Sequence, residues 1–170
     1  MSVYAIPAVD AVLAVASALL AVRESGSNSG RFVNYIQRYG GGKDGEPWCS
    51  YFIYFVAHHA LRSAWPLPRT GSCDILLRDA ERQGLVVENA VRGGLFFVMN
   101  KDNTNDAVHV GFVDEVKPER GPHAFYTCEG NSNEMGSREG VGVFHNLRGM
   151  PDDHRPYVFA DWEQALRRPP

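Results

Sequence analysis

The chain has 170 residues, of which 44% are hydrophobic and 22% charged, a balance typical of one folded domain with its own core. Its 17 basic and 20 acidic residues give a net charge of -3 without a long block of either sign, which argues against nucleic-acid binding. The cysteines form no CxxC pair, so neither a zinc site of the usual spacing nor a small disulfide framework is expected. We expect one domain over residues 1–170, with no cofactor and no metal.

The first apolar segment, Ala11–Val22, is interpreted as an amphipathic helix rather than a targeting sequence. Asp10 precedes it, a basic lead-in is missing, and the segment is too short to span a bilayer. We expect a helix from about Pro7 to Arg23, followed by a polar turn at Glu24–Gly30. The protein is therefore expected to be made in the cytoplasm without a signal peptide, and not to associate with a membrane.

Three more helices are expected before the residue composition of the chain changes to one typical of strands. A short helix at Phe32–Tyr39 precedes the glycine run Gly40–Gly42. Apolar positions recur at helical spacing from Cys49 onward, and Cys73–Gln83 is the next helical segment. The glycine that follows this last segment is a common helix terminator.

The second half of the chain has the composition of β-strands. Apolar, β-branched or aromatic runs alternate with Gly, Asn and Asp, and these runs are Leu95–Met99, Val108–Val116, Phe125–Glu129 and Val141–Phe144. Helices followed by strands predict an α+β domain, in which the N-terminal helices, including the one that begins at Cys49, pack on an antiparallel β-sheet.

Cys49 lies in the first turn of its predicted helix, where the helix dipole favours a thiolate over a thiol. It is therefore a candidate nucleophile, although a lone cysteine on an apolar stripe is most often a buried structural residue. Cys73 follows the predicted cap Thr70–Ser72 and is a second helix-start thiol, without a neighbouring feature that marks it as the nucleophile. Cys128 is expected to point into the core.

A cysteine nucleophile needs a base, and His109 is the best placed histidine. Strand alternation puts Val108, Val110 and Phe112 on one face, and His109 on the other face beside Gly111. The missing side chain of the glycine leaves room beside the imidazole. A satisfied core histidine is the alternative interpretation, because a buried imidazole without a partner is costly.

The other candidates are weaker. His58 and His59 lie on the helix of Cys49, more than about 13 Å along its axis, which is too far for a hydrogen bond. His145 is the second choice of base, at a strand end. The segment Lys43–Glu46 offers two carboxylates, but calcium needs six or more oxygens, so a solvated loop is expected there.

The segment Thr127–Asn131 offers a third polar group. Alternation puts Glu129 and Asn131 on one face and Cys128 on the other. A carboxylate and an amide that face the same way can hold a neighbouring imidazole in one tautomer, although a polar strand end entering a turn is also common. Cysteine, histidine and polar group follow one another in the chain order of papain-like peptidases.

Taken together, Pro47-Trp48-Cys49, His109–Val113 and Thr127–Asn131 resemble the CHAP family of cysteine, histidine-dependent amidohydrolases/peptidases, relatives of the NlpC/P60 peptidases. Flanking segments agree as well, and these are Glu24–Gly30, Arg69–Ser72 and Gly136–Arg138. The resemblance covers about residues 23–148 and implies a papain-like, NlpC/P60-like fold. It departs at Arg92–Leu95, where family members often carry Pro-Gly-Asp.

The resemblance implies a peptidoglycan hydrolase that cleaves amide bonds of the stem peptide, as an N-acetylmuramoyl-L-alanine amidase or as an endopeptidase. It makes Cys49 the nucleophile, His109 the general base and Glu129 the group that orients His109. Asn131 is expected to polarise the site or to complete that orientation. We expect Glu129→Gln to cost less than loss of the nucleophile, because an amide still accepts a hydrogen bond.

The resemblance also implies a place of action on the cell wall, as a phage or prophage lysin or as a delivered antibacterial effector. The expected partners are the stem peptide, an immunity protein, and export or release machinery. We find no separate wall-binding module such as an SH3-like repeat. Two alternatives stay open, a papain-like amidase or acyltransferase that acts on a non-wall substrate, and a non-catalytic wall-binding module.

Overall fold

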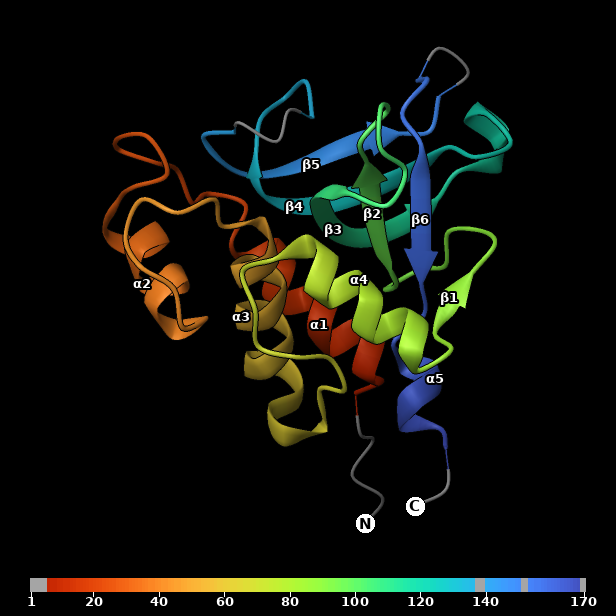
Figure 1. Ribbon diagram of the computed structural model, residues 1–170, viewed down its shortest axis with the longest axis horizontal. Helices are drawn as coiled ribbons and strands as arrows, with labels where there is room; N and C mark the ends of the chain where they lie inside the picture. The colour runs from red at the N-terminus through yellow and green to blue at the C-terminus, as the bar shows by residue number, and fades with distance from the viewer. Residues whose placement is uncertain (1–5, 137–139, 151–152, 169–170) are drawn as a thin grey trace.

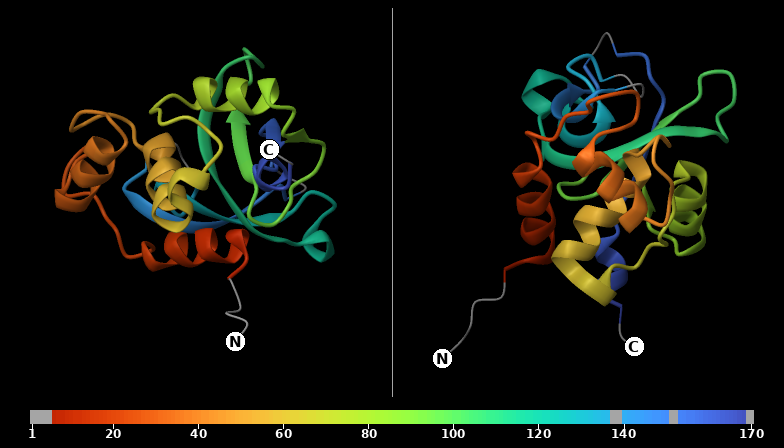
Figure 2. Two further views of the ribbon diagram at one scale, coloured as in Figure 1. Left: turned by 90° about the horizontal axis from the view of Figure 1, so that it is seen from below. Right: turned by 90° about the vertical axis from the view of Figure 1, so that its left-hand side faces the viewer.

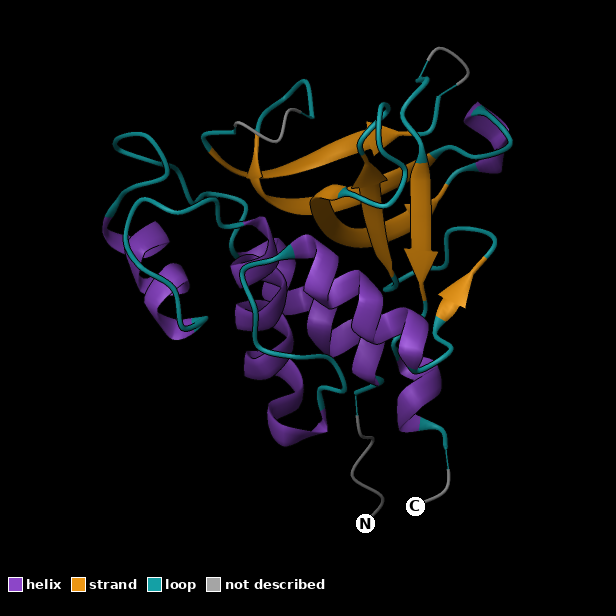
Figure 3. Ribbon diagram, in the orientation of Figure 1, coloured by secondary structure: helices purple, strands orange, loops and turns teal. Residues whose placement is uncertain are grey.

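The computed structural model describes residues 6–136, 140–150 and 153–168. Within these residues, six antiparallel strands form one sheet in the order β1-β6-β2-β3-β4-β5, as expected for an α+β domain (Figures 1 and 3). The strands are β1 (Val86–Val87), β2 (Leu95–Met99), β3 (Ala107–Val116), β4 (Phe125–Ser132), β5 (Gly142–Arg148) and β6 (Tyr157–Ala160). The α-helices are α1 (Ala8–Ala18), α2 (Arg31–Tyr39), α3 (Cys49–Leu61), α4 (Cys73–Arg82) and α5 (Glu163–Leu166), and η1 (Arg62–Ala64) and η2 (Pro118–Arg120) are 3-10 turns.

Helix α3 lies at the centre of the helical layer. It packs on β3 and β4 with one side, while α1 and α2 contact its other sides (Figure 2). A helix that is apolar on nearly every side must be buried, and Phe52, Ile53 and Val56 are accordingly inaccessible to solvent. The start of α3 is thereby fixed against the sheet, and α4 contacts β3 from the neighbouring position.

Helix α1 ends earlier than the sequence predicts, at Ala18 rather than near Arg23. Beyond the helix the chain leaves the helical layer and runs beside β5. Arg23 forms an antiparallel bridge with Gly142, and the N–H of Glu24 donates to the carbonyl of Val141 at 2.8 Å. Hydrophobic spacing extends through this segment, but pairing with the sheet edge replaces the last helical turn.

The predicted strands are present, with different bounds. β4 continues to Ser132 instead of ending at Glu129, and β5 continues to Arg148 instead of Phe144. The short β1, β6 and α5 were not predicted, although β6 pairs with both β1 and β2 and so lies inside the sheet. A run as short as Tyr157–Ala160 gives little periodic signal.

A β-bulge corrects the predicted faces of β3. The pairing with β2 shifts between Val98 and Met99, which makes Val108 an extra residue in the ladder. Val110 and Phe112 lie in the main core beside the helices, as alternation predicts, whereas Val108 packs with the smaller cluster on the other face. The bulge lies directly before His109.

Candidate active site

The start of α3 is held in place by a buried tryptophan. Trp48 is inaccessible to solvent, and its indole N–H donates to Glu24 at 2.7 Å, which ties the helix start to the turn after α1. On the sheet side, a Cβ on Gly130 would lie only 2.5 Å from Phe52, so the glycine permits close approach of β4. These contacts fix the backbone that carries Cys49.

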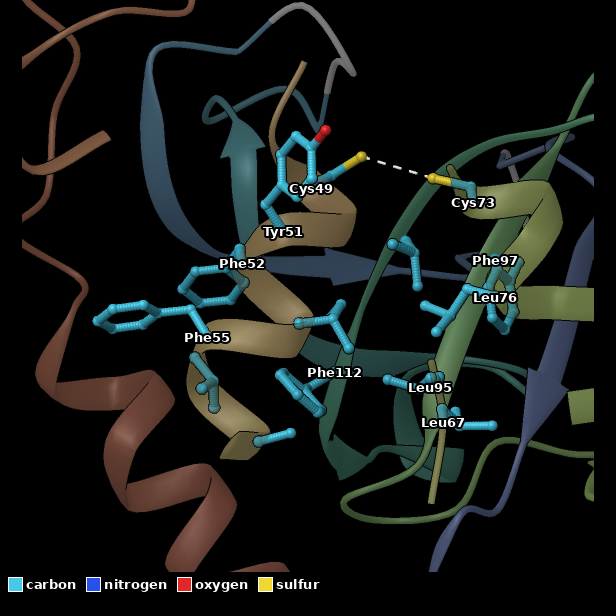
Figure 4. Packing of buried hydrophobic residues seen from close by; sticks show 14 of the residues in the cluster. Cys49, Tyr51, Phe52, Phe55, Leu67, Cys73, Leu76, Leu95, Phe97 and Phe112 are labelled. Atoms are coloured by element: carbon cyan, nitrogen blue, oxygen red, sulfur yellow. Dashed lines mark hydrogen bonds between the residues drawn. The ribbon is translucent and has the colours of Figure 1, made fainter. Parts of the chain in front are cut away.

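A second thiol lies directly beside Cys49. The Sγ atoms of Cys49 and Cys73 are 3.5 Å apart (Figure 4). Cys73 is the first residue of α4, and the hydroxyl of Ser72 accepts a hydrogen bond from the N–H of Ile75, which confirms the predicted cap. Two helices therefore bring their first-turn thiols together at the same place on the sheet.

The two thiols differ in acidity. The contact with Cys73, together with His109, lowers the pKa of Cys49 well below its ordinary value, although burial acts in the opposite direction. The contact with Cys49, together with burial, raises the pKa of Cys73 well above its ordinary value. These directions favour a Cys49 thiolate that accepts a hydrogen bond from the Cys73 thiol. This difference favours Cys49 over Cys73 as the nucleophile.

The imidazole of His109 links the thiol to a carboxylate. Its Nε2 lies 2.9 Å from Oε2 of Glu129, so Nδ1 is the nitrogen left for Cys49. Nδ1 is buried and has no hydrogen-bond partner in the described part of the chain, and His109 and Cys49 shift the pKa of each other. Burial lowers the pKa of His109, but the contacts with Cys49 and Glu129 outweigh it and raise the pKa to about 9. The arrangement favours a thiolate–imidazolium pair.

Glu129 is fully buried and is surrounded by hydrogen-bond donors. Besides His109, it accepts from the hydroxyls of Thr127 at 2.5 Å and Ser132 at 2.9 Å, and from two nitrogens of Arg148 at 2.5 Å each. Burial raises the pKa of Glu129, but the bonds to Arg148 and His109 outweigh burial and hold the pKa well below its usual range. The carboxylate therefore stays ionised and fixes the imidazole ring.

This environment changes the expectation for Glu129→Gln. A glutamine would place an N–H₂ group where the carboxylate accepts hydrogen bonds from its neighbours, and it would leave the guanidinium of Arg148 without its counter-charge. The variant is therefore expected to disturb folding as well as the orientation of His109, rather than to be mild.

Arg148 is the member of this site that sequence reasoning missed. Its side chain is 1% exposed, it also donates to the carbonyl of Gly136 at 3.0 Å, and its guanidinium lies 5.1 Å from the ring centre of Phe96. A buried, ionised Glu129 requires a cation beside it. An arginine at the end of an apolar strand is a candidate for that cation in the sequence. The predicted strand stopped at Phe144, so the arginine fell outside it.

The space beside Gly111 is real, but it is filled by the protein itself. A Cβ there would lie 2.5 Å from the ring of Phe96 and 2.9 Å from Cγ of Glu129. The ring centre of Phe96 lies 6.3 Å from that of His109. The glycine therefore lets the aromatic ring and the carboxylate approach β3 closely.

Asn131 faces a groove rather than the imidazole. The pairing of β4 with β5 shifts between Glu129 and Ser132, and Asn131 has a φ of 54°, so simple alternation fails at this bulge. Asn131 is 2% exposed, and its Oδ1 has no partner among the described residues. No hydrogen bond to His109 is found there either, and Asn131 instead forms part of the groove wall beside Cys49.

The groove has a volume of about 260 Å³ and lies at the starts of α3, α4 and β3. Cys49, Cys73 and Asn131 line it together with the carboxylates of Asp74 and Asp106, and no lysine or arginine of the described chain does so. Asp74 also accepts a hydrogen bond from the first backbone N–H of β3 at 2.7 Å, which joins α4 to the sheet. Cys49 therefore opens onto an acidic cleft.

The rival bases have other partners. The three histidines considered as alternatives contact Tyr39 (His58, 2.5 Å), the carbonyl of Phe55 (His59, 2.7 Å) and Asp114 (His145, 2.8 Å). His145 also stacks on Tyr126, with ring centres 4.9 Å apart. These contacts leave His109 as the histidine next to a first-turn thiol.

The acidic loop at Lys43–Glu46 is tied to its surroundings. Asp44 binds Arg38 and Asn34, and Glu46 accepts from the hydroxyl of Tyr51 at 2.6 Å. Over the ranges that the structure describes, no group of three or more His, Cys, Asp or Glu side chains is arranged to hold a metal ion. Ser137 and Arg138 of the third flanking segment lie outside those ranges.

Comparison with known proteins gives no relative from which a function could be inferred. No protein family matches the chain, and neither curated proteins nor solved structures give a significant match. None of the helices in the described part of the chain has the length and hydrophobicity needed to cross a membrane.

Proposed function

We propose that this chain is a cysteine amidohydrolase with a papain-like, CHAP-type fold that cleaves amide bonds in the stem peptide of peptidoglycan. The observation that carries the proposal is the hydrogen-bonded pair of His109 and Glu129 beside Cys49, whose side chain lines an open groove. The reaction class follows from this array. The wall substrate follows from the resemblance of the motifs that contain it.

In the first step, the Cys49 thiolate attacks the carbonyl carbon of the scissile amide. The C–N bond breaks as the imidazolium of His109 gives its Nδ1 proton to the leaving amine, and a thioester remains on Cys49. Glu129 stays ionised throughout and keeps Nε2 of His109 engaged. No external oxidant or cofactor is required for this exchange.

In the second step, neutral His109 accepts a proton from a water molecule as that water attacks the thioester. The C–S bond then breaks, which releases a carboxylic acid product and restores the thiolate–imidazolium pair. Trp48 makes no side-chain capping bond at the start of α3. The backbone N–H of Cys49 is therefore the proposed donor to the oxyanion in both steps.

The groove suits a peptide that presents N–H and ammonium groups. Oδ1 of Asn131 is a buried acceptor without a partner among the residues that the structure describes, and Asp74 and Asp106 add negative charge. Amino groups on a stem peptide are the complementary chemistry. As a lysin or a delivered effector, the protein would meet this substrate at the cell wall, and a neighbouring holin or immunity gene would distinguish the two.

The test is digestion of isolated peptidoglycan, with products read by mass spectrometry. We expect new termini with the intact protein and none with Cys49→Ala. Free whole stem peptides would indicate an amidase, and shortened or uncrosslinked stems an endopeptidase. If several wall types yield no new termini while Cys49 reacts rapidly with iodoacetamide at neutral pH, the wall substrate is wrong and a non-wall amide or acyl substrate takes its place.

The pH dependence follows from the direction of both pKa shifts. The lowered pKa of Cys49 keeps the thiolate present at lower pH than an ordinary thiol would allow, so the acid limb of kcat/KM should be shifted to lower pH. The pKa of His109 is raised from 6.5 to about 9, so the imidazolium and its stabilising effect on the fold are lost as pH rises through about 9. We expect kcat/KM for an amide to fall above that pH, as measured in a series of buffers.

An ester of the same peptide is the matched control, because its leaving alcohol depends less on protonation than an amine does. Its rate should decline less steeply above pH 9 than the amide rate. An amide rate that keeps rising through pH 10 would contradict the role of His109 as the acid.

A further inference from the structure

The groove contains two thiols, and their separation is short. The Sγ atoms of Cys49 and Cys73 are 3.5 Å apart, whereas a disulfide bond is about 2.05 Å long, so a movement of about 1.5 Å separates contact from bond. Cys49 is 5% and Cys73 7% exposed, and both line the groove. A small reagent that enters the groove reaches both sulfur atoms.

We propose that Cys49 and Cys73 form a reversible disulfide, which makes the pair a redox-modification site and switches the nucleophile off. Only the switch in activity rests on the proposed function, because the bond itself is detected without any substrate. The natural reactant is a small disulfide such as glutathione disulfide. It is the oxidant in the exchange, and a thiolate attacks one of its sulfur atoms.

The exchange balances in two steps. The Cys49 thiolate attacks one sulfur of glutathione disulfide, the S–S bond of the reagent breaks, and one glutathione thiolate leaves. Cys73 then loses its proton and attacks the Cys49 sulfur, which releases the second glutathione. Two protein sulfurs are oxidised, one reagent disulfide is reduced, and the two glutathione thiolates take up the protons from Cys73 and His109.

The two cysteines are suited to different steps. Cys49 is the better first attacker because it lies at the start of α3 beside His109 and its pKa is lowered, which favours the thiolate. Cys73 is held protonated chiefly by its contact with that charge, and the charge disappears once Cys49 is part of a mixed disulfide. The first step therefore removes the main barrier to ionisation of Cys73, and the second step follows on the same molecule.

The third cysteine provides an internal reference. Cys128 lies in β4, is 2% exposed, and burial raises its pKa to about 12. It is expected to stay reduced under conditions that oxidise the pair, as its predicted core position suggests. Oxidation should therefore remove two titratable thiols of three and leave one.

The experiment treats the reduced full chain with glutathione disulfide and follows intact mass, disulfide-linked peptides and wall hydrolysis. For the wild type and for Cys128→Ser, we expect a mass loss of about 2 Da, a Cys49–Cys73 crosslinked peptide and loss of activity, all reversed by dithiothreitol. Cys73→Ser should instead stop with one glutathione attached to Cys49. Cys73→Ala gives the same readout if the serine variant folds poorly.

Other outcomes overturn the proposal. A wild-type protein that retains glutathione on Cys49 while Cys73 stays free would show that the second step does not occur. A protein with three free thiols at equilibrium with glutathione disulfide would show that neither step occurs. A crosslinked protein that hydrolyses the wall at the unmodified rate would rule out the switch. A crosslink in a protein that never cleaves the wall would support the bond and count against the proposed function.

Discussion

Replacing Cys49 with alanine is expected to lower kcat for amide hydrolysis by roughly 10⁴-fold or more, because the step that forms the thioester loses its only activated nucleophile. Cys73 does not substitute for it, since its own pKa is raised rather than lowered. Cys49→Ser is expected to be nearly as inactive, because a serine hydroxyl is not ionised by the neighbours that ionise a thiol. Product release from peptidoglycan or from a synthetic stem peptide measures both variants.

Cys128→Ala is the matched control, since it makes the same change at a buried thiol in β4 that lies outside the groove. It should keep most of the activity and lose some stability through the small cavity. Denaturation by urea separates the two effects. If Cys49→Ala stays active while Cys73→Ala does not, the nucleophile is Cys73 and the assignment of the two thiols must be exchanged.

Replacing Arg148 with methionine is expected to lower the free energy of unfolding by about 3–5 kcal/mol, the cost of leaving a buried charge without its partner. The charge in question is Glu129, which is fully buried and would lose two of its hydrogen bonds. The pKa of Glu129 should rise, and the carboxylate should then hold the ring of His109 less firmly. Urea denaturation at pH 7 measures the first effect, and iodoacetamide reactivity of Cys49 in the folded variant measures the second.

Arg92→Met is the control for this change. Arg92 pairs with Asp10 at 2.7 Å on the surface, where both side chains are about half exposed, so its loss should cost less than about 1 kcal/mol. A double-mutant cycle with Glu129→Gln adds a second check. The pair of changes should be less destabilising than the sum of the two single changes, because neither buried charge is then left alone. Equal losses in Arg148→Met and Arg92→Met would contradict the buried role.

Local pattern was sufficient for much of the fold. The apolar spacing predicts the start of α3 at Cys49 and both ends of α4 within a residue, and four strands were found from alternation and turn residues. Cys49 and His109 were chosen because each stands out locally, one at a helix start and the other within an apolar strand. Each choice depends only on the residues next to it in the sequence, so one sequence is enough to make it.

What failed depends on pairing across the sheet. The bulges before His109 and after Glu129 shift the faces of Val108 and Asn131, and a bulge leaves no clear mark in composition. The contact between Cys49 and Cys73 likewise arises from how α3 and α4 dock on β3. Such features are set by tertiary contacts, so they cannot be predicted from spacing within one element.

The reactive sulfur and the groups that activate it come from different layers of the fold. This separation has a consequence for the folding of the newly made chain. Cys49 belongs to the helices, whereas His109, Glu129 and Arg148 belong to strands formed from the later part of the chain. An unfolded chain carries an ordinary thiol with a pKa of about 8.5. Rapid alkylation of Cys49 at a pH where an ordinary thiol is protonated is therefore expected to count completely assembled molecules.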